Sequence, residues 1–132
     1  MPKLPDAGMT HVGSPYSVAE TVLRLEAVLG AKGIPVLAKI NHAAGAAAAG
    51  LSMKPTELVI FGNAKAGTPI MLAAPTAALD LPLKALVWED ASGVAWVSYN
   101  TPEYLEERHG LPKELTANIA GIRALVNAAI QK

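Results

Sequence analysis

Residues 83–100 read LKALVWEDASGVAWVSYN, and this stretch decides the fold. It contains two runs of apolar, β-branched and aromatic residues, and both runs are typical of β-strands. The three residues between them, Ala91-Ser92-Gly93, form a loop ending in glycine, which favours a tight β-hairpin. This loop predicts a register in which four pairs lie opposite one another: Asp90 and Val94, Trp88 and Trp96, Val87 and Val97, Ala85 and Tyr99.

Both faces of this hairpin are apolar. Side chains alternate across a strand, so one face carries Leu86, Trp88, Val94 and Trp96, and the other carries Ala85, Val87, Ala95, Val97 and Tyr99. A sheet that meets water on one side carries polar residues there, so each of these faces needs a cover. Helices cover one face, and we expect a second copy of the chain to cover the other in a two-fold homodimer. The alternative is that the tryptophan face roofs a ligand pocket.

Two amphipathic helices are predicted, one toward each end of the chain. The first begins at Val18, because Ser17 and Glu20 form a Ser-x-x-Glu capping box in which each side chain pairs with an orphan amide. Its apolar stripe consists of Val18, Val22, Leu25 and Leu29. The second is expected over residues 112–130, where one face carries Leu115, Ile119, Ile122, Val126 and Ala129.

Three shorter helices are expected between the strands. The first covers residues 42–49 and ends at Gly50, because glycine readily terminates a helix. The second is expected over residues 64–74 around Pro69, and proline fits best in a first turn, where its missing N–H leaves no helical hydrogen bond unmade. The third covers residues 101–110, where Thr-Pro-Glu supplies an N-cap, a first-turn proline and an acidic residue.

Three more extended segments complete the sheet. They are residues 9–15, 34–40 (IPVLAKI) and 56–61 (TELVIF). With the hairpin, they predict an α+β fold with a largely antiparallel sheet of about five strands, β-α-β-β-β-β-α-like with short inserted helices. The length suits a single domain over residues 1–132, with residues 1–8 as a flexible lead-in.

The composition argues against several classes of function. The chain has 132 residues, with 11 basic and 11 acidic groups, three histidines and no cysteine. Zero net charge argues against a nucleic-acid partner or an anionic membrane, and without cysteine there is no disulfide, thiol nucleophile or zinc–thiolate site. The histidines have no metal-binding spacing, so we expect no metal and no cofactor. The first eight residues lack the apolar run of a secretory signal, which predicts a cytoplasmic protein.

Two segments together resemble a known family. They are residues 41–71 and 79–111, and their most specific pieces are FGN at 61–63, LPLK at 81–84, WED at 88–90 and YN at 99–100. In order and spacing they resemble the domain-of-unknown-function family 302. The resemblance implies an α+β domain similar to the TATA-binding-protein-like arrangement, found in bacteria and archaea and usually paired as a homodimer. No biochemical function is established for that family, so the resemblance implies little about chemistry.

His42 is the first candidate functional residue, because a titratable imidazole at the end of a strand is suited to proton transfer. The family commonly has Asp-His where this chain has Asn41-His42. A carboxylate holds the tautomer of a neighbouring imidazole or raises its pKa, whereas Asn41 only forms hydrogen bonds. A catalytic role for His42 is weakened accordingly, and a structural histidine at a helix start is the alternative.

The loop at residues 62–68, GNAKAGT, is the second candidate. Backbone amides at a helix start, the charge of Lys65 and the hydroxyl of Thr68 are suited to a small anion. The alternative is a tight turn, because Gly62 and Asn63 tolerate unusual backbone angles. The spacing matches neither phosphate-binding glycine motif, so we expect no nucleotide.

Three functions remain open from the sequence. We favour a small-ligand-binding or regulatory homodimer, with six candidate ligand contacts: His42, Gly62, Asn63, Lys65, Thr68 and Lys84. The second possibility is an enzyme in which His42 acts as acid or base and Lys65 or Lys84 holds an anionic substrate. The third is a purely structural interaction module. The first is favoured because the few acid–base groups form no recognisable catalytic pair.

Overall fold

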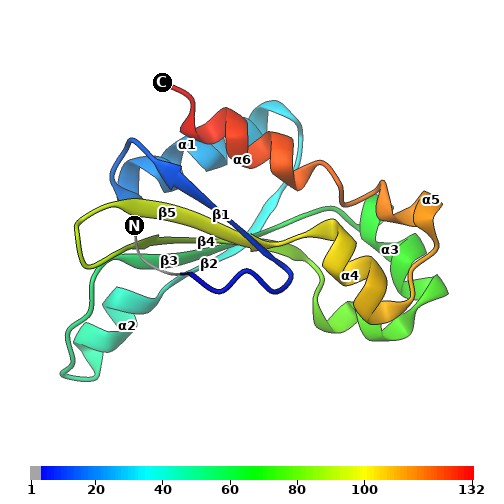
Figure 1. Cartoon of the computed structure of the whole chain (residues 1–132), viewed down its shortest axis with the longest axis horizontal. Helices are drawn as coiled ribbons and strands as arrows, with labels where there is room; N and C mark the ends of the chain where they lie inside the picture. The colour runs from blue at the N-terminus through cyan, green and yellow to red at the C-terminus, as the bar shows by residue number, and fades with distance from the viewer. Residues whose placement is uncertain (1–3) are drawn as a thin grey trace.

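The sheet has five strands and is antiparallel throughout (Figure 1). The structure is a computed structural model that describes residues 4–132. The strands are β1 (Met9–Ser14), β2 (Val36–Asn41), β3 (Thr56–Phe61), β4 (Leu83–Glu89) and β5 (Ala95–Asn100), in the spatial order β1–β5–β4–β3–β2. The predicted α+β class and antiparallel sheet are confirmed. The expected lead-in at residues 1–8 lies partly outside the described residues.

Within residues 4–132, six α-helices and one 3₁₀ helix connect or follow these strands. They are α1 (Val18–Ala31), α2 (His42–Ala48), α3 (Ala64–Ala73), the 3₁₀ helix η1 (Pro75–Leu79), α4 (Pro102–His109), α5 (Lys113–Thr116) and α6 (Ile122–Ile130). Helices α1 and α6 lie side by side across one face of the sheet, which we call the covered face (Figure 1). The guanidinium of Arg24 on α1 donates to the backbone carbonyls of Ala129 and Gln131, which fixes the two helices together.

The main core lies between the covered face and these two helices. Its fully buried side chains are small or aliphatic, with one phenylalanine and one tyrosine among them: Val18, Val22, Leu25, Leu29, Val59, Phe61, Ala85, Val87, Ala95, Val97, Tyr99, Ile122, Leu125, Val126 and Ala129. The predicted stripe of α1 is included in full. Burial of this apolar surface is the main favourable contribution to folding.

The hairpin has the predicted register. Trp88 pairs with Trp96, Val87 pairs with Val97, and the backbone N–H of Asp90 donates to the carbonyl of Val94. The two tryptophans lie on the second face of the sheet, which we call the open face, with ring centroids 6.5 Å apart. The hairpin thus presents an aromatic pair on the open face, and small aliphatic side chains together with Tyr99 on the covered face.

Apolar side chains continue across β4, β3 and β2 on the open face, whereas the same row carries Ser98 and His11 on β5 and β1. The strand register aligns Ile40, Leu58 and Leu86 in one row beside Trp88. Leu58 and Leu86 are half-buried, and Ile40 is 43% exposed. Helix α2 stands out from this side at one end of the sheet and buries none of its residues (Figure 1). Within residues 4–132, no helix lies across this row.

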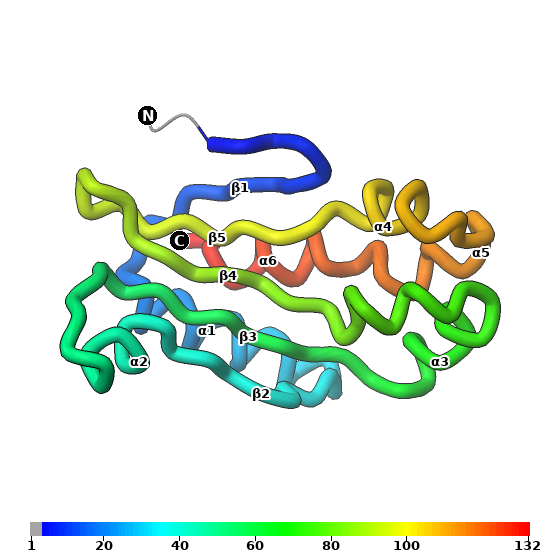
Figure 2. Tube along the Cα trace, turned by 90° about the horizontal axis from the view of Figure 1, so that it is seen from below, coloured from blue at the N-terminus to red at the C-terminus, as the bar shows by residue number. Residues whose placement is uncertain are grey.

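A second hydrophobic cluster lies at one end of the sheet. Figure 2 shows α3, α4 and α5 gathered at this end. The buried members of the cluster are Ile70, Ala74, Ala77, Leu105, Leu111 and Ile119. Leu83, at the start of β4, packs against both this cluster and the main core. The two hydrophobic clusters are therefore neighbours.

The single C-terminal helix predicted over residues 112–130 is wrong. The structure has two helices, α5 and α6, separated by turns at residues 117–121. Ile119 packs in the second cluster, whereas Ile122 packs in the main core. One straight helix cannot serve both clusters, and Asn118 and Gly121, which are poor helix formers, lie at the break.

The prediction that Pro69 lies in a first turn is also wrong. Helix α3 begins at Ala64, because the side chain of Asn63 caps it by accepting a hydrogen bond from the backbone N–H of Ala66 at 2.8 Å. Pro69 is therefore the sixth residue of α3. The following 3₁₀ helix, η1, was not predicted.

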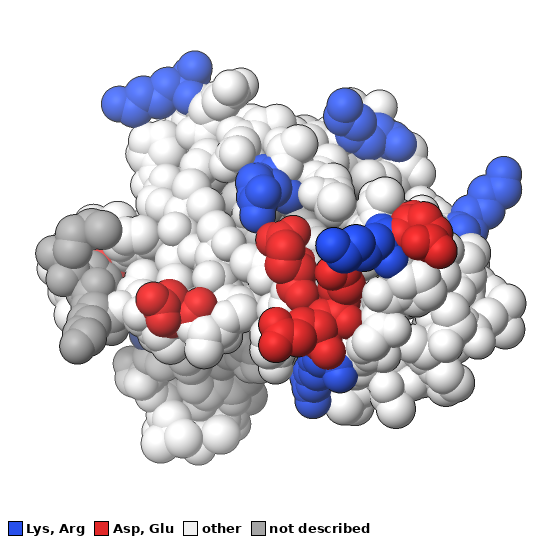
Figure 3. Space-filling view, turned by 45° about the vertical axis from the view of Figure 1, so that its right-hand side comes forward, with Lys and Arg blue, Asp and Glu red and all other residues white. Residues whose placement is uncertain are grey.

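Charged residues form no broad surface of one sign on the face shown in Figure 3. A group of acidic side chains lies near its centre, with basic side chains around it. Some of the charges of the molecule pair directly at the surface, such as Lys39 with Glu26 and Arg123 with Glu103. Exposed pairs of this kind contribute little to stability.

Candidate functional site

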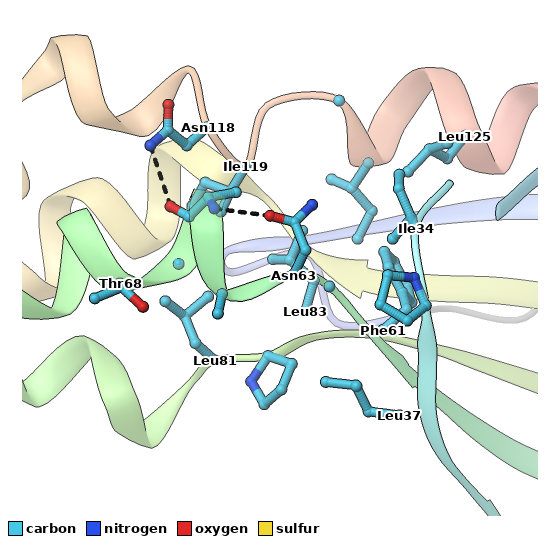
Figure 4. Close-up of a pocket in the computed structure, with 18 of the residues that line it drawn as sticks. Ile34, Leu37, Phe61, Asn63, Thr68, Leu81, Leu83, Asn118, Ile119 and Leu125 are labelled. Atoms are coloured by element: carbon cyan, nitrogen blue, oxygen red, sulfur yellow. Dashed lines mark hydrogen bonds between the residues drawn. The ribbon is translucent and has the colours of Figure 1, made fainter. Parts of the chain in front are cut away.

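A cavity of about 510 Å³ lies where the two hydrophobic clusters meet (Figure 4). Phe61, Ile122 and Leu125 line it from the main core, and Ile119 lines it from the second cluster. The other large apolar side chains of its wall are Ile34, Leu37, Met71, Leu81 and Leu83. The opening is therefore bounded mainly by hydrocarbon side chains.

Three local features of the backbone form the walls. The turn between α5 and α6 places Asn118 and Gly121 at the cavity. An irregularity in the pairing of β2 with β3 lies at Leu37, which is 56% exposed and lines the cavity. The segment Leu81–Pro82, joined by a cis peptide bond, forms the wall before β4.

The polar groups of the cavity gather on one side. Asn63, Thr68 and Asn118 contribute two carboxamides and one hydroxyl, and all three residues are exposed at the rim. The Nδ2 of Asn118 donates to the carbonyl of Ala66, and the backbone N–H of Ala66 donates to Oδ1 of Asn63. Figure 4 shows both hydrogen bonds, which fix these two carboxamides against α3.

No charged side chain lines the cavity within the described part of the chain. The buried side chains of the wall, which include Phe61, Ile119 and Ile122, are hydrocarbon, and the polar side chains that line the cavity are exposed. Ligand sites are typically apolar concavities of 300–1,000 Å³ with a few polar groups that fix orientation. The geometry fits such a site.

Of the six residues singled out from the sequence, the cavity brings together Gly62, Asn63 and Thr68. Lys65 lies on the same helix but does not line the cavity. Lys84 donates from Nζ to the carbonyls of Asp80 and Pro82. Neither lysine is therefore placed to hold a molecule in the cavity.

His42 lies apart from the other five residues. It is the first residue of α2, which is exposed and does not line the cavity. In Figure 2, α2 and α3 lie at opposite ends of the molecule. Asn41 caps α2 by accepting a hydrogen bond from the backbone N–H of Ala44. The structure therefore does not assemble His42 with Lys65 or Lys84 into one site.

Sequence reasoning missed most of the cavity wall. Ile34, Leu81 and Asn118 come from three segments far apart in the chain, and each is unremarkable in its own segment. The available signal was the sequence Thr116 to Gly121, in which several residues disfavour a helix. If one helix ends and another begins within residues 116–121, the apolar residues before and after this break can face different hydrophobic clusters. The prediction of a single helix assigned them all to one face.

A polar cluster lies behind the second hydrophobic cluster. The carboxylate of Asp80 accepts from Arg108 at 3.0 Å and pairs with Nε2 of His109 at 2.5 Å, while Nδ1 of His109 pairs with the hydroxyl of Thr76 at 2.9 Å. The His109 side chain is only 4% exposed. The space beside it has no room for a water molecule, so this cluster joins η1 to α4 and offers no place for a substrate.

Within residues 4–132, no helix is both long and apolar enough to cross a bilayer. In the same residues, no group of three or more His, Asp or Glu side chains is placed to hold a metal ion.

A family model described as "Domain of unknown function DUF302" matches residues 10–130. The chain belongs to the DUF302 family. This identification agrees with the resemblance carried by the segments 41–71 and 79–111, and the match includes every strand except the first residue of β1.

Two similar curated proteins come from Brucella suis and Brucella abortus, and each is named fluoride-specific ion channel FluC 1. Each is 44% identical to this DUF302 chain over 126 residues. The match covers 96% of this chain but only 48% and 46% of those proteins. The chain spans about half the length of these relatives, so their name describes proteins about twice as long.

A solved DUF302 protein shares the fold. The crystal structure of an uncharacterized conserved protein from Bacillus stearothermophilus matches with a TM-score of 0.78, covering 95% of this chain and 97% of that one. The two sequences are 20% identical. At this identity the likeness concerns the fold alone.

Proposed function

We propose that this DUF302 domain binds a small, largely apolar molecule in the cavity between its two hydrophobic clusters. The single observation that carries the proposal is the 510 Å³ opening, whose buried side chains are hydrocarbon and whose polar side chains are all exposed. Apolar surface next to an unfilled space loses the contacts that stabilise a packed core. A bound molecule restores these contacts and stabilises the folded domain.

Gly67 gives a way to close the cavity. It lines the cavity on α3, and a Cβ built on it would lie 3.8 Å from Met71 and 3.9 Å from Leu81, both of which also line the wall. A leucine there extends from this point into the open space. Gly30, near the end of α1, is a matched control, because a Cβ built on it has no neighbour within 4 Å.

The test combines an uncharged fluorescent probe with these two variants. Nile red should bind to the wild-type domain and to Gly30→Leu, and its fluorescence enhancement should fall by roughly tenfold or more in Gly67→Leu. Small molecules carried through native purification should be recovered by mass spectrometry from the wild type and lost from Gly67→Leu. Equal probe binding by Gly67→Leu and Gly30→Leu would contradict the cavity as the binding site.

We also propose that the open face pairs with a second copy of the chain. Antiparallel sheets that face water normally carry polar side chains on that side, but the row Ile40, Leu58 and Leu86 beside Trp88 is apolar. A two-fold pairing buries the same row from both copies. The mass of the protein in solution tests this proposal.

The names of the curated relatives favour a second candidate function, a role beside a fluoride channel. Proteins twice as long as this chain, with the same domain in about half of their length, are named fluoride-specific ion channels. We propose that this domain acts together with such a channel. Deletion of its gene should then increase sensitivity to fluoride in the growth medium, and the wild-type gene should restore resistance. Unchanged fluoride sensitivity would contradict this setting and leave the cavity proposal intact.

A further inference from the structure

We infer that the molecule held in the cavity is an uncharged amphiphile, with a hydrocarbon body and a small head that accepts hydrogen bonds, such as an alcohol or an ester. This inference rests on the proposed function, and it specifies the class of ligand for the same cavity. It follows from three features: the size and lining of the wall, the free donors at the rim, and the absence of any charged side chain among the lining residues 34–125.

The wall sets the body of the ligand. Phe61, Ile119 and Ile122 are almost completely buried and present only carbon to the cavity. The opening of about 510 Å³ lies within the 300–1,000 Å³ range of sites that hold small molecules. A chain of about ten carbons with a short head fits this space and gains from leaving water.

The head is set by Asn63. Its Oδ1 is occupied by the backbone N–H of Ala66 at 2.8 Å, which also fixes the plane of the carboxamide. Figure 4 shows the Nδ2 turned away from Ala66, toward the middle of the cavity. Within the described residues, this Nδ2 donates to no protein atom, so it is free to donate to a ligand oxygen.

Thr68 adds a second polar contact on the same side. Its hydroxyl lies at the rim and is turned toward Leu81 across the opening (Figure 4). The hydroxyl both donates and accepts, so it suits an alcohol or a carbonyl oxygen equally. Asn63 therefore sets the position of the head, Thr68 adds a polar group farther along α3, and the hydrocarbon body extends toward Phe61 and Leu125.

Among residues 4–132, no charged side chain at this rim is placed to pair with an ionic head. Lys65 does not line the cavity, and Lys84 is engaged with two backbone carbonyls. An ionic head would lose part of its hydration without gaining a counter-charge. Neutral heads are therefore favoured over both carboxylates and ammonium groups on the same ten-carbon body.

The experiment compares four ligands of one chain length: 1-decanol, methyl decanoate, decanoate and decylammonium. Each displaces Nile red from the wild-type domain, below the concentration at which the ligand forms micelles. The two neutral compounds should bind about tenfold more tightly than the two ionic ones. Equal or tighter binding of either ionic compound would overturn the inference.

Asn63→Asp tests the position of the head. The aspartate retains an oxygen that caps α3, but it replaces the free donor with a negative charge. Affinity for methyl decanoate should fall by about tenfold, and affinity for decylammonium should rise by a similar factor. Unchanged affinities in this variant, with its helix content preserved by circular dichroism, would overturn the assignment of the head.

Gly67→Leu separates this inference from the proposed function. If Nile red binds as well to Gly67→Leu as to Gly30→Leu, the cavity is not the site and both statements fail. If Gly67→Leu abolishes probe binding but the four ligands show no preference for neutral heads, the cavity proposal stands and the inference about the ligand class fails.

Discussion

Asp90 organises the hairpin turn through its carboxylate. Its Oδ2 accepts from the indole Nε1–H of Trp96 at 2.8 Å, and its Oδ1 accepts from the backbone N–H groups of Ser92 and Val94. The hydrogen bond from Trp96 contributes most to lowering the pKa of Asp90, the backbone bonds add to it, and burial opposes them. The charged form of Asp90 is therefore the form that the fold favours.

The lowered pKa predicts a specific acid sensitivity. An unfolded aspartate has a pKa of about 3.9, so the stabilisation by Asp90 is fully present above about pH 5 and is lost as the pH falls through the lower folded value. When the pH is lowered below 4, the urea concentration at the unfolding midpoint of the wild type should decrease. The decrease should be smaller for Asp90→Asn. Glu103→Gln, at an exposed position, should follow the wild type. Identical pH profiles for wild type and Asp90→Asn would contradict this role.

Ser17 caps the start of α1, and this cap gives a second prediction. Its side chain accepts from the backbone N–H of Glu20 at 3.1 Å, which is the N-cap half of the predicted capping box at the start of α1. Ser17→Ala should lower the free energy of unfolding by about 1 kcal/mol, measured by urea denaturation. Ser17→Asp retains a cap and should remain close to the wild type. An unchanged midpoint in Ser17→Ala would show that the cap contributes nothing.

Among the elements, η1 and α4 depend on a shared carboxylate. Asp80→Ala removes the partner of both Arg108 and the buried Nε2 of His109. Loss of hydrogen bonds to a charged group, with a buried partner left unpaired, should lower the free energy of unfolding by roughly 1–3 kcal/mol. Glu103→Ala breaks an exposed pair with Arg123 and should cost less than about 1 kcal/mol. Equal effects of the two variants, measured in urea, would contradict a structural role for Asp80.

Most of the secondary structure was predictable because local patterns and tertiary packing agree. The stripe of α1 faces one core, and the Ala91-Ser92-Gly93 loop fixes the register of β4 with β5 without help from distant residues. The C-terminal segment is different, because Leu115 and Ile119 pack in one cluster while Ile122 packs in another. Helical spacing alone does not reveal that two faces serve two cores.

The only part of the candidate site that could be predicted from the sequence is the turn that follows β3. Gly62 and Asn63 carry a local signal, since glycine and asparagine at a strand end commonly start a helix or a turn. The opposite wall comes from Ile34, Leu81 and Asn118, whose proximity depends on the whole sheet. Lys65 and His42 were predicted as site residues because they are charged or titratable, but residue type alone does not show which way a side chain points.

Self-association of the protein through the open face gives a further prediction. Ile40→Lys places a charge in the apolar row, whereas Leu23→Lys changes a 61% exposed side chain on α1. Light scattering at micromolar concentration should give about twice the 13.6 kDa chain mass for the wild type and for Leu23→Lys. Ile40→Lys should shift toward the monomer. Trp96 is a poor probe, because it is 6% exposed and bonded to Asp90.

A monomeric wild type at every concentration tested would contradict this pairing. An equal loss of mass in Leu23→Lys and Ile40→Lys would place the interface elsewhere.

The sheet order also determines when the domain can be completed. Met9 on β1 pairs with Asn100 on β5, so β1, which is synthesised before the other strands of this sheet, lies beside β5, which is synthesised after them. Bringing β1 and β5 together closes a long loop of the chain, and this costs conformational entropy before contacts between the two strands stabilise the pair. Folding is slower as a result. During synthesis, β2, β3 and β4 can form their hairpins while β1 still has no partner. A nascent chain that stops before Ala95 leaves β4 as an unpaired edge, where another chain can add.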